Sequence, residues 1–155
     1  MPLNLLSLAF VAVLAMALPP AGAQPSITTH QVQFKKGETG ATLKGTIQGD
    51  QIVDYKLRAG AEQAMVVQFR PSNPSAYFNV LPPGSDEALH IGSSAGNDFA
   101  TDLKASGEYT IRVYLMRNAA RRNESGSYTL DIGISGDVKK SRAPAADTTA
   151  MARGG

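Results

Sequence analysis

Apolar and polar side chains alternate one by one along most of the chain between residues 31 and 135. Tyr109, Ile111 and Val113 show the pattern clearly, because a polar residue follows each of the first two. A period of two residues places alternate side chains on one face of a β-strand. The chain is therefore predicted to form strands that each bury one face, at residues 31–35, 42–47, 53–58, 64–69, 76–81, 87–92, 108–116 and 127–134.

Turn signals rich in Gly, Pro, Asp and Glu separate these segments, as in the sequences KKGETG and PPGSDE. No window of useful length has the apolar period of a helix. About eight short strands at this spacing are typical of an all-β protein. We expect a single antiparallel β-sandwich, jelly-roll-like, whose only helical element is a short turn near residues 117–122.

The two ends of the chain differ from this middle part. An uncharged apolar run at residues 3–18 precedes small residues at a plausible cleavage site, which predicts a signal peptide over residues 1–23. This run is short for a membrane span, so we expect export to the periplasm in soluble form. Residues 24–30 are expected to be a flexible segment, 31–135 the β-sandwich domain, and 136–155 a disordered tail rich in small and polar residues.

Charge and cysteine content narrow the possible functions. The formal net charge is +2, which does not favour a nucleic-acid-binding protein, since such proteins usually carry a strongly basic stripe. The chain contains no cysteine, so its stability depends on a packed core rather than on disulfides. The oligomeric state is not predicted by the sequence.

Catalytic and metal-binding patterns are weak in this sequence. His30 and His90 have no neighbouring Cys, His or Glu at metal-ligand spacing, and no G-x-S-x-G motif is present. We therefore expect no enzymatic activity, no catalytic residues, no cofactor and no metal. Four acidic residues near glycine-rich turns could hold calcium, but without the spacing of a calcium loop they are better interpreted as solvated: Asp86, Glu87, Asp98 and Asp102.

Residues 105–134, ASGEYTIRVYLMRNAARRNESGSYTLDIGI, contain two short motifs, SGEY and RNAAR. With these motifs the segment resembles the periplasmic lysozyme inhibitors of Gram-negative bacteria, most closely the inhibitors of g-type lysozyme. Residues 34–63, which include a G-x-I-x-G hairpin, are similar to the family's opening. The resemblance implies a β-sandwich that inserts loops into the lysozyme cleft. Asp50 stands where the family pattern has an aromatic residue.

The resemblance also implies which residues contact the lysozyme. Arg117 and Arg121 are the expected anchors, with Asn118 between them. On one helical turn, residues four apart share a face, so the two arginines would point the same way, whereas Arg122 would be off that face and solvated. The alternative for these arginines is an ordinary solvated loop.

The SGEY motif gives three further candidates for partner contact: Ser106, Gly107 and Tyr109. A structural role is the competing interpretation, because the similar sequence SGSY precedes another predicted strand at residues 125–128. A different function also stays open. A carbohydrate- or envelope-binding module would use exposed aromatic side chains such as Tyr77, Phe78 and Tyr114.

Overall fold

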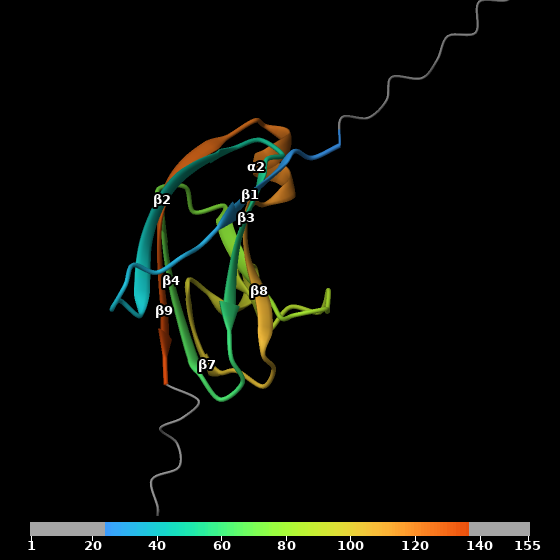
Figure 1. Ribbon diagram of the computed structural model, residues 1–155. Helices are drawn as coiled ribbons and strands as arrows, with labels where there is room; N and C mark the ends of the chain where they lie inside the picture. Colours follow the sequence, from blue (N-terminus) through green and yellow to red (C-terminus); the bar gives the residue numbers. More distant parts are fainter. Residues whose placement is uncertain (1–23, 137–155) are drawn as a thin grey trace, which may run out of the picture.

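The computed structural model describes residues 24–136 of the chain. The predicted signal peptide and nearly all of the predicted tail lie outside the described residues. The described chain forms two β-sheets packed face to face (Figure 1). This arrangement confirms the prediction of an all-β sandwich.

The larger sheet has five strands in the order β1-β3-β8-β5-β6. Their bounds are β1 (Ile27–Gln31), β3 (Ile52–Ala59), β8 (Gly107–Leu115), β5 (Ala76–Leu81) and β6 (His90–Ile91). The smaller sheet has four strands in the order β2-β9-β4-β7. Their bounds are β2 (Gly40–Gln48), β9 (Ser125–Ser135), β4 (Ala64–Pro71) and β7 (Asp98–Asp102).

The core lies between the two sheets and is built from the alternating positions. In β8, Tyr109, Ile111 and Val113 are almost fully buried, while the residues between them are partly exposed. Tyr128 and Leu130 of β9 are buried in the same way. Burial of one face of each inner strand explains why the period of two residues predicts the sandwich correctly.

The first strand departs from two expectations. Ile27–Gln31 form β1, so most of the segment expected to be flexible is instead paired with β3. The pairing is parallel, with Ile27 beside Ile52, so the larger sheet is not wholly antiparallel. All five residues of β1 are exposed. Because the strand buries neither face, its sequence has no alternating pattern that could have predicted it.

The segment after β5 also differs from the prediction. Only His90 and Ile91 of the expected strand over 87–92 pair with β5, and a helical turn, α1 (Gly92–Ala95), follows. The helical turn near residues 117–122 is therefore not the only one. Gly92 begins this turn, and a Cβ atom there would lie 2.5 Å from the carbonyl oxygen of Phe78. This close backbone approach requires glycine.

Two of the acidic residues expected in loops lie in a strand. Asp98 and Asp102 are the ends of β7, which pairs antiparallel with β4 and buries Phe99. Within residues 24–136 no group of three or more His, Cys, Asp or Glu side chains is placed to hold a metal ion. Within the same residues no helix is long and apolar enough to cross a membrane.

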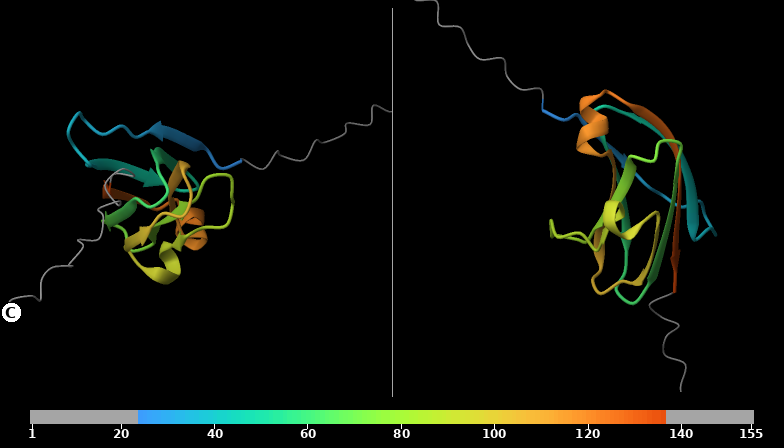
Figure 2. Two further views of the ribbon diagram at one scale, coloured as in Figure 1. Left: turned by 60° about the horizontal axis from the view of Figure 1, so that its bottom comes forward. Right: turned by 180° about the vertical axis from the view of Figure 1, so that it is seen from behind.

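The predicted helical turn is α2 (Arg117–Arg121), which joins β8 to β9. Both strands are interior strands, β8 of the larger sheet and β9 of the smaller one. The connection therefore crosses from one sheet to the other and covers one end of the sandwich (Figures 1 and 2). Ala119, in the middle of α2, is fully buried against the core.

A hydrogen bond between two tyrosines joins the sheets through the core. The hydroxyl groups of Tyr55 in β3 and Tyr128 in β9 lie 2.8 Å apart and are buried. Burial is the main reason that the pKa of Tyr128 is raised, and the hydrogen bond with Tyr55 adds to it. Gly45 of β2 is opposite Tyr128 and leaves room for its side chain.

We predict that Gly45→Ala destabilises the fold. The new Cβ atom would lie 2.5 Å from the Tyr128 hydroxyl oxygen, and this buried, hydrogen-bonded side chain cannot move away cheaply. Overpacking of this kind costs roughly 1–3 kcal/mol. Urea unfolding measures the loss, with Gly133→Ala in β9 as the matched control because its Cβ atom would meet nothing within 4 Å. Equal stability of the two variants would contradict this account.

Candidate functional site

The helical turn α2 presents polar side chains at the end of the sandwich. Arg117, Asn118 and Arg121 are all exposed, while Ala119 on the opposite side of the turn is buried. Arg117 and Arg121 are four residues apart, so they share one face of the turn. The structure therefore brings together the three candidate residues of the RNAAR motif. We call residues 116–122 the arginine tip.

Backbone hydrogen bonds hold the arginine tip in place on both sides. The Met116 N–H donates to the carbonyl of Ser75 at 2.8 Å, which ties the start of the tip to the β4–β5 loop. After the tip, the Glu124 N–H donates to the carbonyl of Ala119, and the Gly49 N–H donates to the carbonyl of Glu124. The tip is thus fixed to the β2–β3 turn as well.

Arg122 is exposed, as expected, and it also pairs with a carboxylate beside the arginine tip. Its Nε and Nη2 atoms lie 2.8 and 2.6 Å from one carboxylate oxygen of Glu124. The other oxygen of Glu124 accepts a hydrogen bond from the Asn73 side chain at 3.0 Å. The hydrogen bond from Asn73, followed by that from Arg122, lowers the pKa of Glu124. We call Asn73, Arg122 and Glu124 the carboxylate clamp.

A hollow of about 470 Å³ lies between the arginine tip, the β2–β3 turn and the outer face of the larger sheet. Ile52, Tyr114 and Ala120 give it apolar surface, and Arg117 is at its edge. Asp50 of the β2–β3 turn lines the same hollow. We call this space the tip hollow.

A second arginine in the tip hollow has its own partner. The Nε and Nη2 atoms of Arg112 donate to the two carboxylate oxygens of Asp54, both at 2.8 Å. Asp54 is buried, and Arg112 is about one third exposed. The hydrogen bonds to Asp54 raise the pKa of Arg112. Arg112 is therefore bound within the protein, whereas neither Arg117 nor Arg121 forms an ion pair within the described residues.

The residues of the SGEY motif lie at the other end of β8. Strand β8 has nine residues, which corresponds to roughly 27 Å at a rise of about 3.3 Å per residue. Ser106 and Gly107 are at its start and the arginine tip follows its end, as Figure 1 shows. The structure therefore does not bring Ser106 and Gly107 together with Arg117 and Arg121.

The contacts of the SGEY motif are internal. The Ser106 hydroxyl accepts a hydrogen bond from the Ala61 N–H at 2.8 Å, and the Tyr109 hydroxyl donates to the carbonyl of Ala105 at 2.6 Å. Tyr109 is only 1% exposed. A Cβ atom on Gly107 would lie 2.7 Å from the Pro83 side chain. These contacts support the structural interpretation of the motif.

The aromatic residues of the alternative function are not a shared exposed platform. Phe78 is fully buried in the core, so it cannot contact a carbohydrate. Tyr77 and Tyr114 are partly exposed, with ring centres 6.4 Å apart and tilted planes. The Tyr114 hydroxyl donates to the Asn79 side chain at 3.2 Å. Tyr114 lines the tip hollow, and Tyr77 is its neighbour on the adjacent strand β5.

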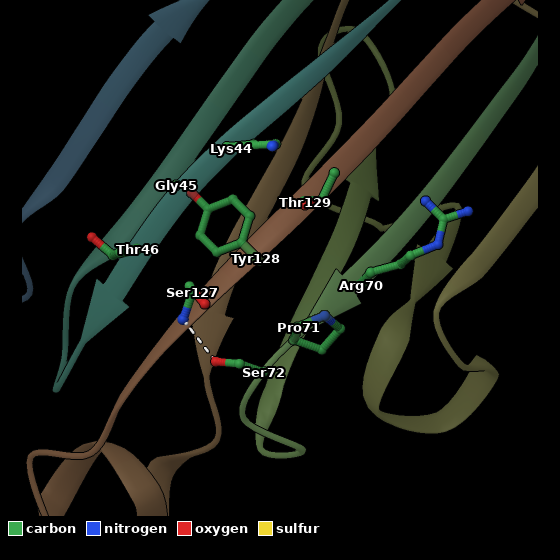
Figure 3. A pocket seen from close by; sticks show the side chains of 9 residues that line it. All are labelled: Lys44, Gly45, Thr46, Arg70, Pro71, Ser72, Ser127, Tyr128 and Thr129. Atoms are coloured by element: carbon green, nitrogen blue, oxygen red, sulfur yellow. Dashed lines mark hydrogen bonds between the residues drawn. The ribbon is translucent and has the colours of Figure 1, made fainter.

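The outer face of the smaller sheet has a shallow hollow of about 700 Å³ (Figure 3). Its exposed side chains include Lys44, Thr46, Arg70 and Ser127, and Arg70 is paired with Asp131. A hydrogen bond from Thr42, together with the contact to Arg70, lowers the pKa of Asp131. Tyr128 is the only aromatic residue lining this hollow, and it is buried.

The two histidines have packing roles in the structure. His90 is buried, its Nε2 lies 2.9 Å from the carbonyl oxygen of Gly96, and its ring stacks on Phe78. His30 stacks on Tyr55, with ring centres 5.5 Å apart. The described residues thus form an all-β sandwich with two exposed arginines on a helical turn at one end.

Comparisons with known proteins identify the family. The inhibitor of g-type lysozyme from Escherichia coli (strain K12) is 31% identical over 126 residues, which cover 79% of this chain and 93% of that protein. No protein-family model matches the chain. The chain belongs to the family of periplasmic inhibitors of g-type lysozyme.

Solved structures agree with this assignment. The periplasmic inhibitor of g-type lysozyme from Aeromonas hydrophila, PliG, is 38% identical with a TM-score of 0.67, covering 72% of this chain and all of that one. PliG of Salmonella Typhimurium is 28% identical with a TM-score of 0.55, covering 69% of this chain and 97% of that one. By their names, all three relatives are inhibitors of g-type lysozyme.

We predict that Glu124→Gln lowers stability in a pH-dependent way. The pKa of Glu124 is lower in the folded protein than its ordinary value of 4.5, so the carboxylate contributes stability above that pH. This contribution is lost as the pH falls through the lowered pKa. Urea unfolding should therefore show the variant less stable than wild type at neutral pH, with the difference shrinking as the pH falls below 4.5 and through the lowered pKa.

The matched control for the carboxylate clamp is Glu87→Gln, because Glu87 is exposed in the β5–β6 loop. Asp131 also has a lowered pKa, so it too makes stability depend on pH. Because wild type and both variants contain Asp131, its effect cancels when their free energies of unfolding are subtracted. The contradicting result would be free energies of unfolding of Glu124→Gln and wild type that differ by the same amount at every pH. That result would mean that the carboxylate clamp does not stabilise the arginine tip through its charge.

Proposed function

We propose that the chain is a periplasmic inhibitor of g-type lysozyme that inserts the arginine tip into the substrate cleft. Family membership supports the activity, the partner and the compartment. The single observation that supports the mode of binding is the exposure of Arg117, Asn118 and Arg121 on a turn whose opposite side is buried. The predicted signal peptide over residues 1–23 fits export to the periplasm.

The chemistry of lysozymes explains why arginines suit this role. Glycoside hydrolases generally use a pair of carboxyl groups on either side of the bond that they cleave. A guanidinium group is planar and can donate two parallel hydrogen bonds to one carboxylate. Arg117 and Arg121 are two such groups on one face of a short turn, so they could pair with carboxylates inside a narrow groove and exclude the substrate.

Rigidity of the arginine tip favours tight binding. Binding orders flexible side chains and loops at a cost in free energy, and a loop that is already fixed loses less. The buried Ala119, the backbone hydrogen bonds to Ser75 and Gly49, and the carboxylate clamp all fix the turn before binding. Ser106, Gly107 and Tyr109 have no direct contact in this proposal, because they lie at the opposite end of β8.

We predict that the double variant Arg117→Ala/Arg121→Ala no longer inhibits g-type lysozyme, while its thermal stability stays close to that of wild type. Truncating a hydrogen-bonded charge pair at an interface costs about 2–5 kcal/mol, so each single variant should lose more than about tenfold in inhibition. The measurement is lysis of a cell-wall suspension by goose-type lysozyme with increasing inhibitor. Chicken-type and invertebrate-type lysozymes, run in parallel, should be inhibited less.

Arg58→Ala is the matched control for charge, since Arg58 is exposed in β3 beside the far end of β8. It should inhibit like wild type, as should Ser106→Ala. Normal inhibition by the double variant, or its early melting, would contradict cleft insertion. Equal inhibition of all three lysozyme classes, or of none, would contradict the assignment of the target.

Lysine variants separate geometry from charge. Arg117→Lys keeps the positive charge but loses the planar pair of donors, so we expect a substantial loss of inhibition. The same lysis assay measures it at two ionic strengths, because general electrostatic attraction weakens with added salt. Full activity of Arg117→Lys would reduce the role of Arg117 to its charge.

A further inference from the structure

The tip hollow continues the proposed contact surface toward the larger sheet. Arg117 is part of both the arginine tip and the hollow's edge. If Arg117 enters the lysozyme cleft, the rim of that cleft must come to rest over the hollow. The inference below therefore depends on the proposed function.

The lining of the tip hollow is largely apolar and already ordered. Ile52 of β3 and Tyr114 of β8 are neighbours in the sheet, and Ala120 contributes from α2. All three are partly buried before any partner is present. The hydrogen bond from Tyr114 to Asn79 fixes the ring. Pre-formed apolar pockets at the centre of interfaces usually receive one large side chain from the partner.

Charge in the tip hollow favours an occupant without net charge. Arg112 is neutralised by its two hydrogen bonds with the buried Asp54. Asp50 and Arg117, both exposed, contribute opposite charges at the edge. A cationic side chain would meet Arg117 and an anionic one would meet Asp50, so neither is favoured. The carboxylate of Asp50 can still accept a hydrogen bond from an uncharged donor.

We propose that the tip hollow receives an aromatic side chain with a hydrogen-bond donor, tyrosine or tryptophan, from the rim of the lysozyme cleft. Its ring packs on Ile52, Tyr114 and Ala120, and its O–H or N–H donates to Asp50. A volume of about 470 Å³ is sufficient for such a side chain. Tyrosine and tryptophan are enriched at interfaces because they combine a large apolar surface with one polar group. The inhibitor thus both inserts side chains and accepts one.

Two variants of the hollow test this proposal. Ala120→Leu fills the space, and Ile52→Thr removes apolar surface while keeping a β-branched side chain in the strand. Each should raise the inhibition constant for g-type lysozyme at least tenfold, while the melting temperature stays near that of wild type. The matched control is Val66→Thr, a similar change at an exposed strand position of the smaller sheet, which should leave inhibition unchanged.

A cross-link identifies the occupant directly. A photoreactive amino acid in place of Gln51, which lines the hollow, should join the inhibitor to a lysozyme peptide that contains tyrosine or tryptophan. A cross-linked peptide without either residue would overturn the proposal, as would wild-type inhibition by both Ala120→Leu and Ile52→Thr. If the wild-type protein does not inhibit g-type lysozyme, the proposed function fails with it. If only the Arg117→Ala/Arg121→Ala variant loses activity, the tip-hollow proposal alone fails.

Discussion

The burial of Ala119 is the contact on which the arrangement of this site depends. The chain must pass from an interior strand of one sheet to an interior strand of the other, and α2 makes this crossing at the end of the sandwich. A small apolar side chain at the centre of the turn lets it sit directly on the core. Because α2 completes only about one helical turn, burial of Ala119 forces Arg117 and Arg121 outward.

The same crossing makes one end of the molecule different from the other. Near α2, the β2–β3 turn and the β4–β5 loop are hydrogen-bonded to the connection, so three segments distant in sequence form one rigid surface. At the opposite end, the Tyr109 hydroxyl donates to the carbonyl of Ala105 in its own turn, and the Ser106 hydroxyl accepts a hydrogen bond from Ala61 of the β3–β4 turn. The functional surface is therefore expected at the α2 end, where the exposed Arg117 and Arg121 stand beside the tip hollow.

Much of the fold could be predicted from the alternation of side chains, since strands such as β8 and β9 bury one complete face. Strand β1 could not, because it buries neither face and is held by pairing with β3. The role of Arg122 could have been suspected from Glu124, only two residues away. The pairing of Arg112 with Asp54 could not, because 58 residues separate them and only the register of β3 and β8 makes them opposite.

The sequence predicted that Arg117 and Arg121 share one exposed face, but it did not predict that the SGEY motif lies at the far end of β8. A residue four positions away on a helical turn has a fixed direction, whereas the direction of a turn before a strand depends on loops elsewhere in the chain. Pro83 and Ala61, which contact Gly107 and Ser106, come from two such loops. The placement of the motif follows from the packing of these loops rather than from its own sequence.

The most direct test of the account is hydrogen–deuterium exchange of the inhibitor, alone and in complex with goose-type lysozyme. Exchange reports which backbone amides become protected when the partner binds. We expect new protection in residues 48–52 and 115–123, around the arginine tip and the tip hollow, and none in residues 104–108. Protection confined to residues 104–108, with no change around the arginine tip, would contradict it.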